Sequence, residues 1–144
     1  MKRNPWLVLG GVLSAAAAIL HVAVIAGGPD WYRFFGAGEE MARMAEQGRL
    51  TPHLITIGIA LVLGLWGAYA LSGAGVIRRL PLIRTALVAI TAIYLLRGLL
   101  LVPALLQEPR DPFTIWSSLI VLVYGIAYGL GTWRAWPALS RRAA

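Results

Sequence analysis

Residues 6–26 read WLVLGGVLSAAAAILHVAVIA, a stretch of 21 residues that carries no formal charge. A helix of about 20 apolar residues is long enough to cross the hydrocarbon core of a bilayer. Three more stretches of similar length and character follow it along the chain. We therefore predict an all-α fold, a four-span transmembrane helix bundle with spans at about 6–27, 52–72, 82–106 and 113–136, within a single integral-membrane domain covering residues 1–144.

The composition agrees with a membrane protein. The chain is 59% hydrophobic and only 13% charged, whereas a soluble domain carries about 25% charged residues. It contains no cysteine, which excludes disulfide exchange, thiolate nucleophiles and cysteine-ligated metal sites. A cleaved signal peptide is the alternative reading of the first stretch, but the apolar region of such peptides is about 7–15 residues long. We favour an uncleaved span.

The charged residues alternate between the connecting segments. Basic residues gather in the segments that alternation of four spans would place on one side: Lys2, Arg3, Arg78, Arg79, Arg84, Arg134, Arg141 and Arg142. All six acids lie in the other two segments: Asp30, Glu39, Glu40, Glu46, Glu108 and Asp111. The positive-inside rule then predicts cytoplasmic N- and C-termini in a bacterial inner membrane, with membrane lipids as partners. We attribute the net charge of +7 to the basic residues of the predicted cytoplasmic segments, and we expect no nucleic-acid partner.

The first outer loop is more than a polar connector. Residues 39–47 have Met41 and Met44 on one side of a helix and charged residues on the others. Gly48 is placed to end this helix. Trp31 and its aromatic neighbours are typical of a membrane interface. We predict a short amphipathic helix in this loop, which lies over the outer face as a lid.

Polar side chains within the spans need a separate explanation, because an ionisable group in a bilayer costs about 2.5–3.5 kcal/mol or more. Pro103 is predicted to kink or shorten the outer end of the third span. Arg97 lies six residues before Pro103, which is roughly 9 Å along a helix. His21 lies six residues before Gly27, and His53 begins the second span. Three polar residues on three helices are thus predicted in the outer third of the membrane.

These positions predict a polar pocket that opens outward, floored by Tyr94 and covered by the loop. Its candidate ligand-binding residues are Arg97, His21, His53, Tyr94, Glu39, Glu40, Trp31 and Trp116, with Ser117 and Ser118 entering at the same depth. Each has a structural alternative. Arg97 pairs with Glu39 or Glu40, or extends to the headgroups along its aliphatic stem; the histidines are helix contacts, and the glutamates are solvated.

Three functions remain open. The leading hypothesis is a non-enzymatic protein that binds a lipid, a small amphiphile or a membrane partner through this pocket. The first alternative is a membrane enzyme acting at the outer leaflet with a histidine as general acid or base, although no catalytic residue stands out. The second is a dimeric small transporter. A homodimer and a partner within a membrane complex both stay open.

We expect no metal and no cofactor. The sequence contains no HxxxH, HExxH or ExxH motif that would place two metal ligands on one helix face. Known four-span families are excluded residue by residue: there is no glutamate in the first span, as in small multidrug-resistance transporters, and no cysteine pair, as in quinone-linked disulfide enzymes. The chain resembles bacterial four-span inner-membrane proteins in architecture alone, which implies no site.

Overall fold

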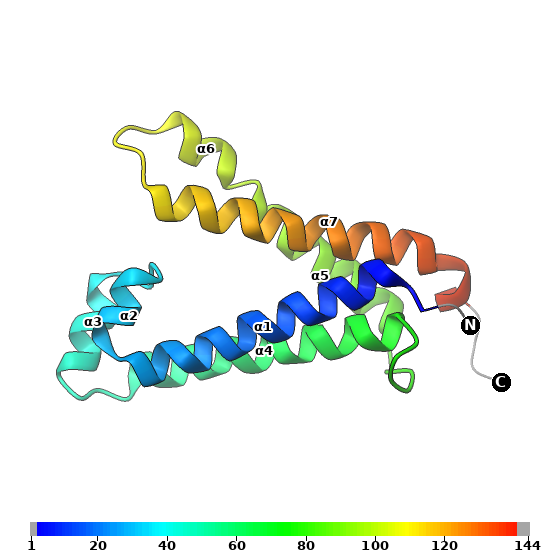
Figure 1. Ribbon diagram of the computed structural model, residues 1–144, viewed down its shortest axis with the longest axis horizontal. Coiled ribbons are helices and arrows are strands. Elements are labelled where there is room, and N and C mark those ends of the chain that lie inside the picture. The colour runs from blue at the N-terminus through cyan, green and yellow to red at the C-terminus, as the bar shows by residue number, and fades with distance from the viewer. Residues whose placement is uncertain (1–2, 141–144) are drawn as a thin grey trace. The chain divides into compact units, whose positions relative to one another are not determined.

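The computed structural model describes residues 3–140, which contain helices and connecting turns and no strand. In chain order the helices are α1 (Pro5–Gly27), α2 (Pro29–Phe34), α3 (Glu39–Glu46), α4 (Thr51–Gly73), α5 (Ile83–Gly98), α6 (Leu101–Leu106) and α7 (Pro112–Ser140) (Figure 1). Four segments are long and apolar enough to cross a membrane: α1, α4, α5 with α6, and α7. The predicted all-α, four-span fold is confirmed, and it fits a small multi-pass membrane protein.

The first helix begins and ends where the sequence indicates. The Asn4 Oδ1 atom accepts hydrogen bonds from the first two free N–H groups of α1, at 3.1 and 3.3 Å, as expected of an N-cap residue. The helix ends at Gly27. Gly28 follows with φ 73°, a conformation that glycine adopts without steric cost. Pro29 then occupies the first turn of α2, where its missing N–H is not needed.

The first loop folds into two short helices with a small core of their own. The predicted amphipathic helix is α3, and Gly48 follows it with φ 70°. Val24, Tyr32 and Ala42 form a buried apolar cluster, against which the half-buried Phe35, Met41 and Ala45 pack. The aromatic residues of α2 therefore have a structural role. They join α2, α3 and the end of α1 into one folded piece.

The third span is interrupted near Pro103, as its sequence suggests. A proline within a helix lacks an N–H donor, and its ring clashes with the carbonyl four residues earlier, here that of Leu99. The helix α5 ends at Gly98, and α6 begins only at Leu101. Figure 1 shows α6 as a short separate helix that leads into the turn before α7.

The fourth span is longer than predicted. We expected it to end at residue 136, but α7 continues through Pro137 to Ser140. The Ser140 hydroxyl donates a 2.7 Å hydrogen bond to the Trp136 carbonyl. This side-chain bond takes up a carbonyl in the last turn, where backbone donors run out. At the other end, Asp111 caps the helix by accepting the N–H groups of Phe113 and Thr114 at 3.1 Å each.

The contacts divide the chain into two compact units. The smaller unit is Ala15–Leu65, and the larger unit combines Met1–Ser14 with Trp66–Ala144. Within the larger unit, α5 and α7 approach closely at two glycines. A Cβ on Gly98 would lie 2.8 Å from the Leu122 Cα, and one on Gly125 would lie 2.7 Å from a Leu95 methyl group. Small residues permit such contact between membrane helices. The predicted single domain stays a prediction.

Candidate functional site

The eight candidate residues fall into both compact units. Arg97, Tyr94 and Trp116 belong to the larger unit; His21, Trp31, Glu39, Glu40 and His53 belong to the smaller one. Each unit therefore has its own cluster of polar groups, around Arg97 in the larger unit and around Arg33 in the smaller one. The single pocket that would combine all eight residues stays a prediction.

Arg97 is the polar centre of the larger unit. It lies half-buried in the last turn of α5, and its guanidinium reaches across to α7. The Nη1 atom donates to the Ser118 hydroxyl at 2.9 Å, and Nη2 donates to the Ser117 hydroxyl at 3.3 Å. The close α5–α7 approach at the neighbouring Gly98 makes this reach feasible. Residue counting placed Arg97 at the same depth as Ser117 and Ser118, and these residues are in direct contact.

No carboxylate of the larger unit neutralises Arg97 among its described residues. Glu108 pairs with Arg110 at 3.2 Å, and Asp111 is occupied in capping α7. The position near the C-terminal end of α5 is favourable for a cation, by about 0.3–1 kcal/mol. That is less than the cost of placing an arginine within a span. A guanidinium has five N–H donors, and the two serines accept only two of them.

Tyr94 belongs to a hydrogen-bonded chain that joins four helices of the larger unit. Its hydroxyl lies 2.9 Å from the Ser14 hydroxyl, which lies 2.8 Å from that of Tyr128. Tyr128 donates to the Trp66 carbonyl at 3.0 Å. Because that carbonyl only accepts and each hydroxyl has one proton, Ser14 donates to Tyr128, and Tyr94 donates to Ser14. The chain is fully satisfied.

The rings around this chain are tightly packed. The Tyr94 ring contacts those of Trp66, Tyr124 and Tyr128, with centroids 5.0, 5.4 and 5.2 Å apart. Only 4% of Tyr94 is exposed. With its hydroxyl occupied and its ring enclosed, Tyr94 supports the packing beneath Arg97. The role of Tyr94 in this arrangement is structural.

Arg33 is the polar centre of the smaller unit. Its Nε and Nη2 atoms donate to the two Glu39 carboxylate oxygens at 2.9 Å each, and Nη2 also donates to Glu46 at 2.8 Å. Asp30 accepts from Nη1 at 3.3 Å. The hydrogen bonds from Arg33 lower the pKa of Glu39, and the same bonds raise the pKa of Arg33. Three carboxylates surround this one guanidinium.

The remaining polar candidates of the smaller unit are Glu40, His21 and His53, and each contacts a group within that unit. Glu40 pairs with Arg43, one turn away, at 3.3 Å. The His21 Nδ1 atom lies 2.7 Å from the Ala17 carbonyl; since a carbonyl only accepts, Nδ1 carries the proton. The His53 Nδ1 atom is buried without a hydrogen-bond partner, and the same is true of the Tyr32 hydroxyl. The rings of these two residues meet edge-on at 6.1 Å.

The two candidate tryptophans have different surroundings. The Trp31 ring covers Gly27, where a Cβ would lie 2.1 Å from it, and it contacts the Phe35 ring at 5.6 Å. Trp116 is 65% exposed, on the turn of α7 next to the two serines that hold Arg97. An exposed indole beside a cation suits contact with the apolar part of an amphiphile.

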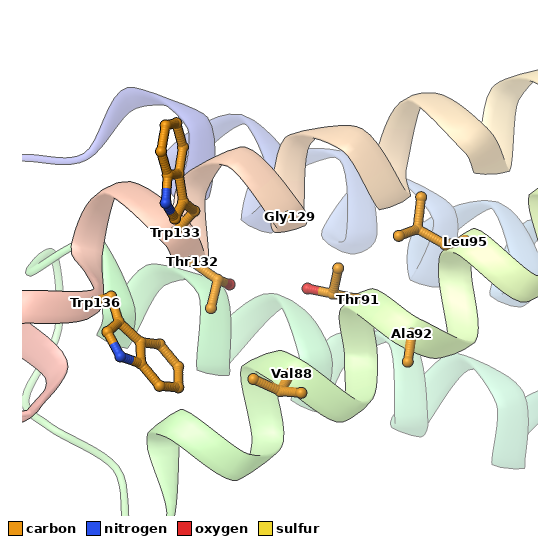
Figure 2. Close-up of a pocket in the computed structure, with 8 residues that line it drawn as sticks. All are labelled: Val88, Thr91, Ala92, Leu95, Gly129, Thr132, Trp133 and Trp136. Carbon is orange, nitrogen blue, oxygen red and sulfur yellow. The ribbon is translucent and has the colours of Figure 1, made fainter.

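A groove opens between α5 and α7 elsewhere in the larger unit. It has a volume of about 440 Å³ and is lined by Val88, Thr91, Ala92 and Leu95 of α5 and by Gly129, Thr132, Trp133 and Trp136 of α7. Figure 2 shows the Thr91 and Thr132 side chains directed toward each other across it, with the two tryptophans at one end and Leu95 at the other. The candidate pocket predicted from the sequence does not include these residues.

Sequence reasoning missed several polar partners. Asp30, Glu39 and Glu46 were treated as separate charges, although their spacing around Arg33 within two short helices was a signal that they share one cation. Tyr128 and Ser14 carried no signal, because nothing in their spacing shows that they meet. Among residues 3–140 no cluster of three histidine and acidic side chains could hold a metal ion.

Comparison with known proteins adds no relative. No protein-family model, curated protein or solved structure matches this chain.

Proposed function

We propose that this small multi-pass membrane protein binds an anionic amphiphile, such as a phospholipid headgroup with its chains, at Arg97. The observation that carries the proposal is the incomplete environment of the guanidinium. It lies half-buried in a helix long and apolar enough to span the bilayer, yet its partners in the larger unit are two neutral hydroxyls. An anionic oxygen would supply both the missing charge and the missing acceptors.

The proposed ligand has an anionic part and an apolar part, because the site combines the cationic Arg97 with the exposed indole of Trp116. Arg97 would bind the anionic group in a bidentate geometry, which the fork of the guanidinium favours. Ser118 and Ser117 orient that fork through the observed hydrogen bonds. Trp116 would contact the chains. In the proposed topology the termini are cytoplasmic, and the turn at 107–111 faces the periplasm of a bacterial inner membrane.

The first test measures lipid binding by the full chain in detergent. Native mass spectrometry would compare dioctanoyl phosphatidylglycerol with dioctanoyl phosphatidylcholine, which have the same chains but different net charges. We expect Arg97→Gln to weaken binding of the anionic lipid by about 10- to 100-fold, since hydrogen bonds to charged groups contribute about 1.5–3 kcal/mol. Arg97→Lys should retain part of the affinity.

The matched control is Arg49→Gln, which removes the same charge from an exposed position outside the spans. It should leave the affinity within about twofold of the wild-type value, a change of less than 0.5 kcal/mol. Equal losses in the two variants would reduce the effect to general charge attraction and overturn the proposal. Unchanged binding by Arg97→Gln would do the same.

A further inference from the structure

The groove between α5 and α7 contains a buried polar atom with no partner. Thr132 is 6% exposed, and its hydroxyl has no hydrogen-bond partner. A threonine in a membrane helix ordinarily donates to the carbonyl four residues earlier. Thr91, on the opposite wall, does this at 2.7 Å with Leu87. The Thr132 side chain instead lines the groove (Figure 2), and its hydroxyl oxygen is enclosed at the groove wall without a partner.

The groove has a cation at one end. The Arg84 guanidinium lies 4.1 Å from the centroid of the Trp136 ring, and Trp136 lines the groove. Arg84, Val88, Thr91 and Leu95 are three or four residues apart, so they follow one face of α5. The groove therefore leads from a charged, tryptophan-rich end into an apolar interior. That order matches a lipid from headgroup to chain.

The charges at this end are of one sign. Arg78, Arg79, Arg84 and Arg134 lie in the loop before α5, in its first turn and in the last turns of α7. The acids of the larger unit are Glu108 and Asp111, and both lie in the turn at the opposite end of the α5–α7 pair. An anionic headgroup is thus favoured over a zwitterionic one.

We propose that this groove binds one phospholipid with an anionic headgroup, whose phosphate pairs with Arg84 and whose ester carbonyl accepts a hydrogen bond from Thr132. One acyl chain lies between Val88, Leu95 and Gly129, against the exposed Trp133. Trp136 and Thr132 are four residues apart, about 6 Å along the helix. This separation places the hydroxyl below the phosphate, at the level of the glycerol esters. In the proposed topology this is the cytoplasmic leaflet.

The volume is suitable for such a ligand. A groove of about 440 Å³ lies within the range of about 300–1,000 Å³ for small-molecule sites. The site has determinants separate from Arg97, since its cation, Arg84, lies in the first turn of α5 whereas Arg97 lies in the last turn, and the groove uses none of the side chains that contact Arg97. Two bound lipids per chain are therefore expected, each with its own determinants.

The test counts tightly bound lipids on the full chain by native mass spectrometry, with dioleoyl phosphatidylglycerol and dioleoyl phosphatidylcholine as probes. We expect Thr132→Val, which keeps the shape and removes the hydroxyl, to weaken one of two anionic lipids by about three- to tenfold, the range of one hydrogen bond. Thr91→Val is the matched control, because that hydroxyl is already bound within its own helix; it should change the affinity less than about twofold.

Two further variants separate folding from binding. Thr132→Ser keeps a hydroxyl and should keep the lipid. Arg84→Gln should weaken the anionic lipid about tenfold and phosphatidylcholine by less, because both lipids carry the phosphate but the choline of phosphatidylcholine offsets its charge. Arg97→Gln should remove the other lipid and retain this one, so failure of one site is distinguishable from failure of the other. Equal effects of Thr132→Val and Thr91→Val, equal binding of the two lipids, or a dimer that dissociates on Thr132→Val would each overturn the proposal.

Discussion

Arg33 in the smaller unit and Arg97 in the larger unit have the same guanidinium in opposite environments. Three carboxylates surround Arg33, which lies in a loop helix with access to water. Arg97 lies within an apolar span and contacts two serine hydroxyls. Water could solvate the charge of the exposed Arg33, yet Arg33 has three carboxylate partners. In the larger unit, Arg97 has only neutral hydroxyls among its described partners.

This difference distinguishes a charge that stabilises the fold from a charge that can bind a ligand. The Arg33 cluster holds α2 and α3 together through side chains that are already paired, so it has little capacity for a ligand. Arg97 retains its charge and three of its five donors beyond the two serine contacts. The arginine with the incomplete environment is the better candidate for binding. The following predictions test whether this contrast decides function.

The largest effect should come from giving Arg97 an internal counterion. Ser117→Asp would place a carboxylate where a hydroxyl now accepts from Nη2 at 3.3 Å, so that Arg97 becomes paired as Arg33 is. We expect binding of the short-chain anionic lipid to fall by about tenfold or more, because the ligand must displace an ion pair. Native mass spectrometry measures the change.

Ser117→Asn is the control for this exchange, since it has nearly the same shape and no charge. It should reduce binding less than Ser117→Asp. A carboxylate that leaves the affinity unaltered would show that the unpaired state of Arg97 is irrelevant to binding.

The next effect concerns the helix contact that brings Arg97 to its serines. Gly98→Ala adds a Cβ that would lie 2.8 Å from the Leu122 Cα, so the backbones of α5 and α7 must move apart. We expect the free energy of unfolding to fall by about 1–3 kcal/mol, measured by denaturation in detergent. Gly58→Ala is the control, because nothing lies within 4 Å of its new Cβ. Equal destabilisation by both variants would contradict the close contact.

A smaller effect should follow from breaking the satisfied hydroxyl chain. Ser14→Ala leaves Tyr94 without its acceptor and Tyr128 with its bond to the Trp66 carbonyl. We expect a loss of roughly 0.6–2 kcal/mol in unfolding free energy, the range for hydrogen bonds between membrane helices. Combination with Tyr94→Phe should cost less than the sum of the two single changes. Strict additivity would mean that the two hydroxyls do not interact.

The smallest effect is the response of the Arg33 cluster to acid. The pKa of Glu39 is lowered below its ordinary value of 4.5 in the folded protein, so folding is favoured at higher pH and this contribution is lost as pH falls through the lowered value. Hydrogen exchange in α2 and α3, corrected for its intrinsic pH dependence, should accelerate modestly as the pH is lowered below 4.5 and Glu39 is protonated. The response should weaken in high salt.

Glu39→Gln at neutral pH should reproduce the acid effect, whereas Glu40→Gln should have less influence, because Glu40 pairs with the exposed Arg43 at 3.3 Å and not with Arg33. Exchange in the α2–α3 segment that is insensitive to both acid and Glu39→Gln would show that the apolar cluster of Val24, Tyr32 and Ala42 holds this segment alone.

Much of the fold was predictable because its signals are local. The length of the apolar stretches predicts the spans, Gly48 ends the loop helix, and Pro103 interrupts the third span. Counting residues also placed Arg97 at the depth of Ser117 and Ser118, since the rise along a helix is constant. These conclusions require only distances along the chain.

The polar partners were less predictable because they depend on how each helix is rotated about its axis. A rotation of one residue, about 100°, exchanges a side chain that meets a neighbour for one that faces lipid. Thr132 and Thr91 are both threonines within apolar helices, but the Thr132 hydroxyl has no hydrogen-bond partner, whereas the Thr91 hydroxyl donates to the Leu87 carbonyl. Likewise, nothing in the spacing distinguishes Ser14 from a serine that merely packs.

The sequence alone determined that this chain is helical, that four of its segments can span a bilayer, and that a cation lies within one of them. It does so because a bilayer core offers no hydrogen bonds to the backbone, so apolar length dictates helix and span. The tertiary structure decided which polar groups meet across the helices, since the Arg97–Ser118 and Ser14–Tyr94 contacts join residues 21 and 80 positions apart in the chain. Within the larger unit they gave Arg97 two neutral hydroxyls as partners and left the Thr132 hydroxyl without one.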